Sequence, residues 1–159
     1  MKEEFINLIR EHENLILKVC NVYCSQTEDR EDLYQDILVQ LWKAYPRFNQ
    51  QSKISTWIYR IAFNTAVSRF RKYKNTPSKE PISEQLPDAV PSTKPEDVQQ
   101  LELAINELNE LEKAITLLYM DGCKYREIGE IIGISETNVG FKINRIKKKL
   151  FKILNQNQL

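Results

Sequence analysis

The spacing of apolar residues predicts three helices in the first half of the chain. Apolar positions with a helical period run from Phe5 to Tyr23 and define the first helix. The second runs from Leu33 to Tyr45 and ends at Pro46, because a proline removes a backbone donor and clashes with the preceding turn. The third starts at Ser55 or Thr56, either of which is a favourable N-cap residue. Its buried stripe is predicted to consist of Trp57, Ile58, Ile61, Ala62, Ala66 and Phe70.

The second half of the chain carries the same helical period. Helices are predicted over Val98–Leu108 and Leu111–Met120, and two shorter amphipathic segments follow in "YREIGEIIGISETNVGFKINRIKKKL", residues 125–150. No segment alternates between apolar and polar residues as a half-buried strand would. The pattern therefore predicts an all-α fold.

A proline-rich stretch separates the two helical halves. Five of the six prolines fall in "NTPSKEPISEQLPDAVPSTKPEDV", which has neither a helical nor a strand period. Proline-rich segments of this kind favour extended connections. We therefore expect two small helical domains, residues 1–75 and 98–159, joined by a flexible, acidic, Pro-rich linker at residues 76–97.

Charge is segregated along the chain although the net charge is only +1. Residues 1–42 contain four Lys/Arg and nine Asp/Glu, whereas residues 43–75 contain eight Lys/Arg and no acid. The pattern recurs, since residues 100–136 contain three bases and eight acids and residues 137–159 contain six bases and no acid. Each domain is therefore predicted to have one basic face for a polyanion and one acidic face for another partner.

Length and composition restrict the class of protein further. With 159 residues and 42% hydrophobic content, the chain suffices for one globular domain or two small ones. No apolar run approaches the roughly 18 residues that cross a bilayer, and acids interrupt the N-terminus, so we expect a cytoplasmic protein without membrane insertion. Three cysteines and one histidine favour buried reduced thiols over a disulfide framework or a zinc site, and no metal or cofactor is expected.

Residues 125–150 fit a helix-turn-helix. Gly129 would allow the second helix to approach closely, Gly133 would supply the turn, and Ser135 is a favourable N-cap. The shared core is predicted to contain Ile128, Ile132, Ile134, Val139 and Ile143. Polar and basic residues remain on the outward face of the second helix, as in a recognition helix that contacts DNA. A generic helical hairpin with a solvated lysine tail is the alternative.

Four features follow one another along the chain: "EDLYQDILVQLWKAYPRF", "STWIYRIAFNTAVSRFRK", the acidic proline-rich linker and the C-terminal helix-turn-helix. In this order they resemble the extracytoplasmic-function (ECF) group of bacterial RNA polymerase sigma factors, over nearly the whole chain. The most specific part is "DLYQD" followed at family spacing by Trp42, Pro46, Phe48, Trp57 and Asn64, because many other regulators share a helix-turn-helix.

The resemblance implies three sets of site residues. The acidic helix would dock on the largest catalytic subunit (beta-prime) of core RNA polymerase through Asp32, Leu33, Gln35, Asp36 and Gln40. The region that reads and melts the minus-10 element would use Gln50, Gln51, Ser52, Lys53, Tyr59, Arg60, Phe63, Asn64, Arg69 and Arg71. The helix-turn-helix would read the minus-35 element through Arg126, Ser135, Thr137, Asn138, Phe141, Lys142, Arg145, Lys148 and Lys149.

Local chemistry agrees with these assignments but leaves alternatives. Opening a duplex without ATP requires aromatic, amide and phosphate contacts that replace base stacking, and residues 50–71 offer all three. Trp57 is expected to be a core residue rather than a stacking platform. The acidic residues lie outside the apolar stripe of their helix, so a solvated helix face is the alternative to a docking surface.

Two departures from the family pattern change the expected partners. Ser68 stands where the family often has an Asp, and Gly140 and Phe141 replace a common Lys-Ser pair in the recognition helix. A helical glycine costs up to about 1 kcal/mol and removes a phosphate contact, so minus-35 recognition is expected to be weaker or unusual. Besides the beta-prime and beta subunits of polymerase, promoter DNA and an anti-sigma factor, a separately DNA-bound recruiting factor is therefore a candidate partner.

The sequence leaves three classes of function, namely a sigma factor, an ordinary helix-turn-helix regulator and an enzyme. A sigma factor accounts for both basic regions, whereas an ordinary helix-turn-helix regulator with an effector domain would not need the basic, aromatic segment in its first domain. An enzyme has little support, because all four glycines lie in the last 40 residues, no phosphate-binding loop is present, and the acids of residues 29–36 spread around a helix. The sequence therefore predicts a non-enzymatic sigma factor, with the regulator as the alternative.

Overall fold

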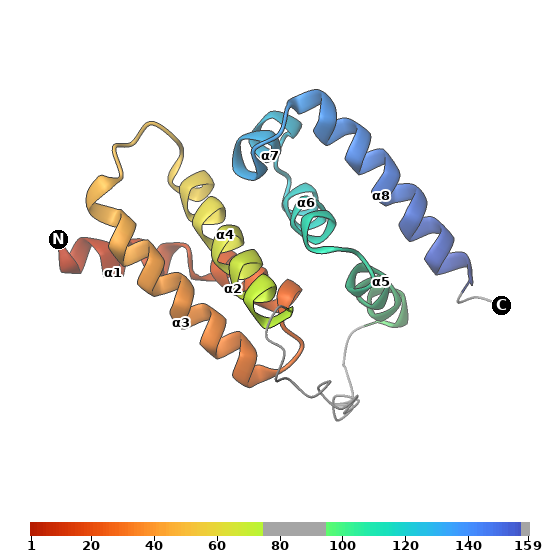
Figure 1. Ribbon diagram of the computed structural model, residues 1–159, viewed down its shortest axis with the longest axis horizontal. Helices are drawn as coiled ribbons and strands as arrows, with labels where there is room; N and C mark the ends of the chain where they lie inside the picture. Colours follow the sequence, from red (N-terminus) through yellow and green to blue (C-terminus); the bar gives the residue numbers. More distant parts are fainter. Residues whose placement is uncertain (75–94, 157–159) are drawn as a thin grey trace. The chain divides into compact units, whose positions relative to one another are not determined.

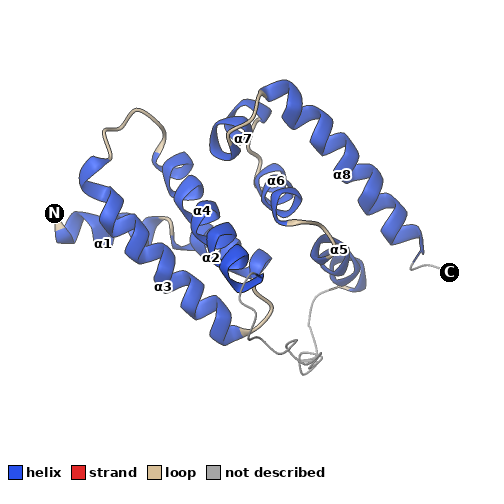
Figure 2. Ribbon diagram, in the orientation of Figure 1, coloured by secondary structure: helices blue, strands red, loops and turns tan. Residues whose placement is uncertain are grey.

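A computed structural model describes residues 1–74 and 95–156, and in this part of the chain every regular element is a helix (Figure 2). The chain divides into two compact units, residues 1–79 and 80–159, which are described separately. The first contains α1 (Lys2–Glu11), α2 (Glu13–Tyr23), α3 (Thr27–Ala44), a 3-10 turn η1 (Tyr45–Arg47) and α4 (Ile54–Lys74). The second contains α5 (Glu96–Asn106), α6 (Glu110–Met120), α7 (Tyr125–Ile132) and α8 (Glu136–Gln156). The predicted all-α fold is confirmed.

Helices α2, α3 and α4 pack against one another and form the core of the first unit (Figure 1). Their fully buried side chains share a helical period on each element, because residues three and four apart lie on one face. These residues are Ile16, Val19 and Cys20 of α2, Leu33, Ile37 and Leu41 of α3, and Ile58, Ala62 and Ala66 of α4. The packed surface fixes how the exposed faces of α3 and α4 lie beside each other.

The predicted single helix from Phe5 to Tyr23 is wrong, because the chain leaves helical geometry at His12. The His12 backbone has φ −115° and ψ 16°, and its ring Nδ1 donates to the Leu8 carbonyl oxygen at 3.0 Å. The His12 backbone N–H also donates to this carbonyl at 3.2 Å, so the side chain adds a second hydrogen bond at the end of α1. The change of direction lets Phe5 of α1 and Ile16 of α2 both become buried.

Helix α4 starts earlier than the sequence indicates. It begins at Ile54, so Ser55 and Thr56 lie inside its first turn and neither is the N-cap. The Trp57 backbone N–H donates to the Lys53 carbonyl, and Thr56 is buried. Phe70, predicted to be part of the buried stripe, is 39% exposed, because the core of this unit ends before the last turns of α4.

The second unit is held together by α8, which packs against α5, α6 and α7. Its core is built from Ala104, Leu108, Ala114, Ile115, Leu118, Ile128, Ile131, Val139, Ile143 and Ile146. Helix α6 begins with a capping box, in which Asn109 and Glu112 satisfy each other's backbone N–H groups. The sequence contains this signal, an Asn followed three residues later by a Glu, although the predicted helix started at Leu111.

The turn of the predicted helix-turn-helix is present with the expected chemistry. Gly133 ends α7 with φ +88°, a left-handed conformation that glycine adopts without a Cβ clash. A Cβ on Gly129 would lie 2.6 Å from the Ile134 carbonyl oxygen, so only glycine allows this approach. The Ser135 hydroxyl accepts the Asn138 backbone N–H at 3.2 Å and caps α8.

The predicted linker lies mostly outside the described residues. Only its last residues are described, and α5 begins at Glu96, two residues before the predicted start at Val98. None of the helices in residues 1–74 and 95–156 combines the length with the apolar character that crossing a bilayer requires.

Candidate functional site

The outer face of α3 carries the predicted polymerase-docking residues with one exception. Asp32, Gln35, Asp36 and Gln40 are exposed and lie outside the buried stripe of this helix. Leu33 is 1% exposed and belongs to the core, so its assignment to the docking surface is corrected. The core requires an apolar side chain at this position, because Leu33 belongs to the same buried stripe as Ile37.

Arg69 of α4 lies against the acidic face of α3. One guanidinium nitrogen donates to Asp36 Oδ2 at 2.8 Å, and the other lies 3.6 Å from Asp32 Oδ2. The Arg69 side chain is 33% exposed, and the Asp32 and Asp36 side chains are 64% and 56% exposed, so solvent screens much of these ion pairs. Arg69 was predicted as a DNA contact, but in this structure it neutralises part of the acidic face.

The loop between η1 and α4 presents the two glutamines that were predicted to contact unpaired DNA. Both Gln50 and Gln51 are exposed, and Gln50 has φ +60°, which is uncommon for a residue with a side chain. The Gln51 backbone N–H donates to the Asn49 side-chain oxygen at 3.3 Å and stabilises the turn. Backbone strain of this kind is concentrated at functional sites. Of the neighbouring candidates, Lys53 is exposed and Ser52 is half-buried.

Tyr59 and Phe63 are core residues, which corrects their assignment to direct DNA contact. They are 2% and 4% exposed, and their rings stack with centroids 5.7 Å apart. Phe63 also packs edge-on against Tyr23 of α2. Since neither ring face is accessible, an unpaired base cannot stack on them in this structure. Trp57 packs against Phe48 and Tyr45, in agreement with the expectation that it supports the core.

An open groove of about 440 Å³ lies along α3 and α4 and contains Asn64. The lining joins residues predicted for two different partners, and it consists of Asp36, Gln40, Asn64, Thr65, Ser68, Arg69 and Lys72. Thr65, Ser68 and Lys72 were not predicted, although their spacing from Asn64 places them on the same helical face. Two further predicted cations, Arg60 and Arg71, are exposed on α4.

The outward face of α8 contains most of the predicted minus-35 residues. Val139, Ile143 and Ile146 are buried on the opposite side. The exposed residues of α8 include Thr137, Asn138, Phe141, Arg145, Lys148 and Lys149, whereas Lys142 is half-buried. Ser135 is exposed at the start of this helix, and Arg126 lies on α7, where it forms an ion pair of 3.7 Å with Glu130. The structure therefore presents a continuous polar and basic face, apart from Phe141.

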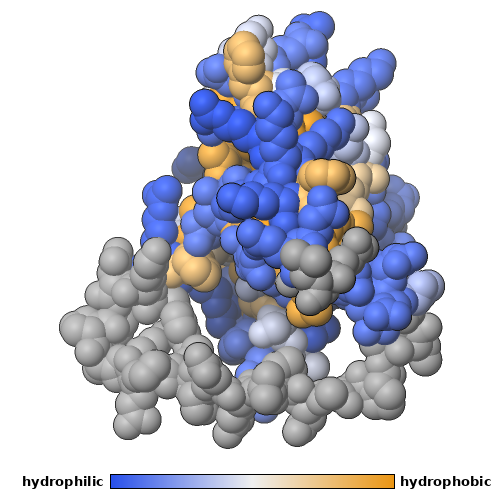
Figure 3. Space-filling model, turned by 90° about the vertical axis from the view of Figure 1, so that its right-hand side faces the viewer, coloured by the Kyte–Doolittle hydropathy of each residue, from blue (hydrophilic) through white to orange (hydrophobic). Residues whose placement is uncertain are grey.

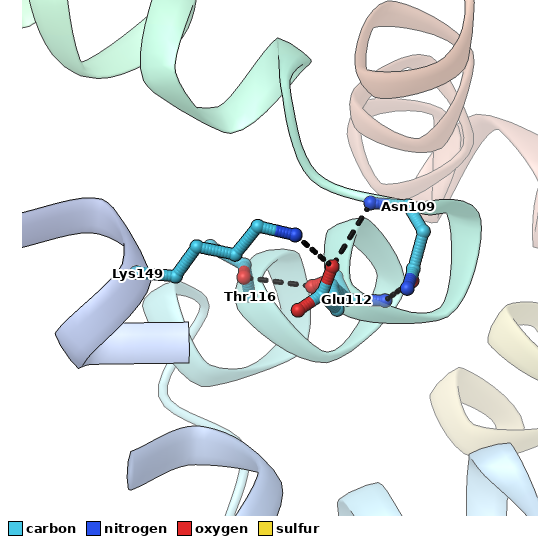
Figure 4. Close-up of polar contacts among 4 residues, drawn as sticks. All are labelled: Asn109, Glu112, Thr116 and Lys149. Atoms are coloured by element: carbon cyan, nitrogen blue, oxygen red, sulfur yellow. Dashed lines mark hydrogen bonds and ion pairs between the residues drawn. The ribbon is translucent and has the colours of Figure 1, made fainter. Parts of the chain in front are cut away.

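Two lysines of α8 contact the protein itself. Lys149 Nζ lies 3.1 Å from Glu112 Oε1, the oxygen that also accepts the Asn109 backbone N–H of the capping box (Figure 4). Lys147 lies over the Tyr119 ring, with Nζ 4.9 Å from its centroid. A hydrogen bond with the Tyr119 hydroxyl raises the pKa of Lys147, which is a charged amine in any case at neutral pH. Both contacts attach α8 to α6.

The second unit also contains an apolar pocket of about 180 Å³. It lies between α5, α6 and α8, and is lined by Leu101, Ile105, Ile115, Thr116, Tyr119, Met120, Ile143, Ile146, Lys147 and Leu150. Met120 at its rim is 60% exposed. A cavity of this composition suits an apolar side chain of a partner better than a polar small molecule.

Within residues 1–74 and 95–156, no three or more His, Cys, Asp or Glu side chains come together as a metal site. Cys20 is fully buried, and burial raises the pKa of its thiol from 9.0 to about 11, so that it remains protonated at neutral pH. A protonated, inaccessible thiol is a poor nucleophile.

Comparisons with known proteins match both units. Residues 8–76 match the family described as Sigma-70 region 2, and residues 98–150 match Sigma-70, region 4. The ECF RNA polymerase sigma factor SigW of Bacillus subtilis is 28% identical over 96% of this chain and 90% of its own length. The ECF RNA polymerase sigma factor SigM of Mycobacterium tuberculosis is 23% identical over 94% of this chain and 76% of its own length.

Two solved structures have a similar fold. The sigma factor RpoE of Bartonella quintana, in complex with the anti-sigma factor NepR, has a TM-score of 0.72 and 21% identity, with 97% of this chain and 96% of that one covered. CnrH, in complex with the cytosolic domain of CnrY, has a TM-score of 0.70 and 17% identity, with 98% and 90% covered.

The two matched regions lie in the two units of the chain and define a bacterial RNA polymerase sigma factor. The chain belongs to the ECF group of sigma-70 factors, in agreement with the resemblance seen in its motifs. Sigma factors as a class are regulatory subunits of RNA polymerase rather than enzymes.

Proposed function

We propose that this sigma factor binds core RNA polymerase through the exposed acidic face of α3 and directs it to promoters through α4 and α8. The observation that carries the proposal is that the two matched sigma regions present an acidic face on α3 and basic faces on α4 and α8. Asp32, Gln35, Asp36 and Gln40 are accessible on α3, and a carboxylate-rich face suits a basic partner surface such as one on the beta-prime subunit.

In the first unit, the loop at Gln50 and Gln51 and the groove around Asn64 capture an unpaired base of the minus-10 element. All three amides are exposed, and amide groups can hydrogen-bond to the Watson–Crick edge of a flipped base. The exposed cations Lys53, Arg60 and Arg71 supply phosphate affinity. Tyr59 and Phe63 act indirectly, because they hold α4 against the core.

In the second unit, α8 reads minus-35 DNA in the major groove. Thr137, Asn138 and Phe141 near its N-terminus contact base edges, and Lys142, Arg145 and Lys148 contact phosphates. Gly140 supplies no cation, and a Cβ at this position would lie 3.7 Å from the Tyr125 ring of α7. A separately DNA-bound recruiting factor would compensate for the missing contact.

We also infer that a regulatory protein covers this sigma factor. Two structures of similar fold hold an anti-sigma factor or the cytosolic domain of a second protein. The apolar pocket between α5, α6 and α8 offers a place for an apolar side chain of such a partner, or of the polymerase beta subunit.

The docking proposal is tested by removing charge from the acidic face without changing its shape. The double variant Asp32→Asn, Asp36→Asn should lose most of its affinity for core polymerase in the absence of DNA, measured by fluorescence titration. Arg69→Gln is the matched control, because it breaks the same ion pairs but leaves both carboxylates. It should bind core polymerase as tightly as the parent or more tightly.

Two outcomes would contradict the assignment. If the folded double variant binds core polymerase as the parent does, the docking surface lies elsewhere. If Arg69→Gln loses binding to the same extent, the ion pairs act through the packing of α3 and α4 rather than through the carboxylates.

A further inference from the structure

Phe141 is an apolar residue in the middle of the polar face of α8. Its side chain is 63% exposed, and it points away from the buried Val139 and Ile143 on either side of it in the sequence. Asn138 lies one turn before it and Arg145 one turn after it, and both are exposed. The ring therefore projects from the same face as the residues proposed to contact DNA.

Exposure alone would not make Phe141 special. Single exposed apolar residues are common on proteins, and Figure 3 shows separate apolar spots on a mostly hydrophilic face of this one. Phe151, on the same helix, is 68% exposed. What distinguishes Phe141 is its place in the first two turns of α8, the part of a recognition helix whose side chains reach base edges.

The chemistry of a phenyl ring limits what it could contact there. It has no charge for a phosphate, and no donor or acceptor for the polar groups of a base edge. The major-groove edges of the four base pairs contain one apolar group, the C5-methyl of thymine, and phenylalanine is among the side chains that contact it. Asn138, by contrast, has the amide that can pair with an adenine edge.

We propose that Phe141 is a specificity-determining residue that recognises the C5-methyl group of a thymine in minus-35 DNA. The inference rests on the proposed function of α8 in reading the major groove. Side chains three residues apart on a helix have Cβ atoms about 5–6 Å apart, which is within two base-pair steps of 3.4 Å. The thymine therefore lies within one or two base pairs of the base that Asn138 contacts.

The test removes the methyl group and nothing else. The full chain, assembled with the core polymerase of its source organism, selects minus-35 sequences from a randomised duplex library. Each thymine of the selected element is then replaced by deoxyuridine, which pairs identically but lacks the C5-methyl group. Affinity is measured for the parent, for Phe141→Ala and for the control Phe151→Ala, each checked for fold by circular dichroism and thermal unfolding.

We expect one deoxyuridine replacement to lower the affinity of the parent about three- to tenfold, as the loss of one buried methyl group implies. The same replacement should change the affinity of Phe141→Ala less than about 1.5-fold, whereas Phe151→Ala should keep the full sensitivity of the parent. This pattern would establish the contact, because the effect of removing the methyl group would depend on the ring at position 141 and not on the ring at position 151.

The results that would overturn the inference are separate from those that would overturn the function. If Phe141→Ala remains as sensitive to deoxyuridine as the parent, or if no thymine position is sensitive in the parent, Phe141 does not read a thymine methyl group. If the polymerase complex enriches no minus-35 sequence at all, α8 does not read DNA, and both proposals fail.

Discussion

Two of the cations that the sequence assigns to DNA contact carboxylates that lie far away in the sequence. Arg69 pairs with Asp36, 33 positions earlier, and Lys149 pairs with Glu112, 37 positions earlier. No local pattern could indicate contacts between residues so far apart in the sequence. Counts of charge along the chain therefore overestimate the positive charge that is available to DNA.

Lys148 and Lys149 should consequently respond differently to substitution by alanine. Lys148→Ala should lower the slope of log affinity against log salt for promoter DNA by about one and leave stability unchanged, since it removes one phosphate contact. Lys149→Ala should change the slope less and lower the free energy of unfolding by about 0.5 kcal/mol, because it also removes the ion pair with Glu112. Salt titration and thermal unfolding distinguish them; identical behaviour of the two variants would contradict the structure.

Cys20 should be unreactive in the folded protein. Burial raises the pKa of its thiol from 9.0 to about 11, so alkylation at pH 8 should modify Cys20 only after denaturant is added. Between pH 9 and pH 11 the unfolded chain loses this proton while the folded chain keeps it, so the contribution of Cys20 to stability should decline as pH rises through this range. Mass spectrometry of the Cys20 peptide tests the first statement, and denaturant unfolding as a function of pH, with Cys20→Ser as the control, tests the second.

Helices α7 and α8 each contain one glycine, Gly129 and Gly140, and the two helical positions look equivalent in the sequence. A Cβ on Gly129 would lie 2.6 Å from the Ile134 carbonyl oxygen, whereas a Cβ on Gly140 would lie 3.7 Å from the nearest ring atom of Tyr125. The first distance is a backbone clash and the second an ordinary van der Waals contact. At Gly129, alanine would gain helix propensity but would clash with the backbone of the turn. At Gly140, alanine would gain helix propensity without a clash.

The same substitution should then have opposite effects at these two sites. Gly140→Ala should raise the free energy of unfolding by about 0.5–1 kcal/mol, the gain in helix propensity. Gly129→Ala should lower it by about 1 kcal/mol or more, because the turn must move to relieve the clash. Denaturant unfolding of the full chain measures both, and a stabilising Gly129→Ala would show that the two helices do not approach as described.

Elements whose signals are local could be predicted from the sequence. The chemistry of Gly133 and Ser135 predicted the turn and its cap, because a left-handed glycine and an N-cap serine act within a few residues. His12 was missed, because a helix that changes direction keeps nearly the same apolar period. Leu33, Tyr59 and Phe63 were placed at binding surfaces because a linear motif does not show which way each side chain points.

At the scale of the whole molecule, polymerase binding and DNA opening should be separable. Asn64→Ala, and the double variant Gln50→Ala, Gln51→Ala, should retain binding to core polymerase but lose most open-complex formation, since they lack the amides that capture an unpaired base. Permanganate footprinting of unpaired thymines on duplex promoter DNA measures the opening.

Position 50 offers a control for the backbone of this loop. Gln50→Gly relieves the strain of φ +60° but removes the amide, so it should preserve or raise stability while impairing opening. Opening at the level of the parent in all these variants would mean that the base is captured elsewhere.

Arg69 also makes the two proposed partners of the sigma factor thermodynamically dependent on each other. A guanidinium that donates to Asp36 at 2.8 Å cannot at the same time offer its full charge to a phosphate. If polymerase binds Asp36, Arg69 is released and can contact DNA. By reciprocity, DNA that binds Arg69 makes Asp36 available to polymerase, and each partner improves the binding free energy of the other by the same amount. Because this ion pair is exposed, the coupling through Arg69 should amount to no more than about 1 kcal/mol.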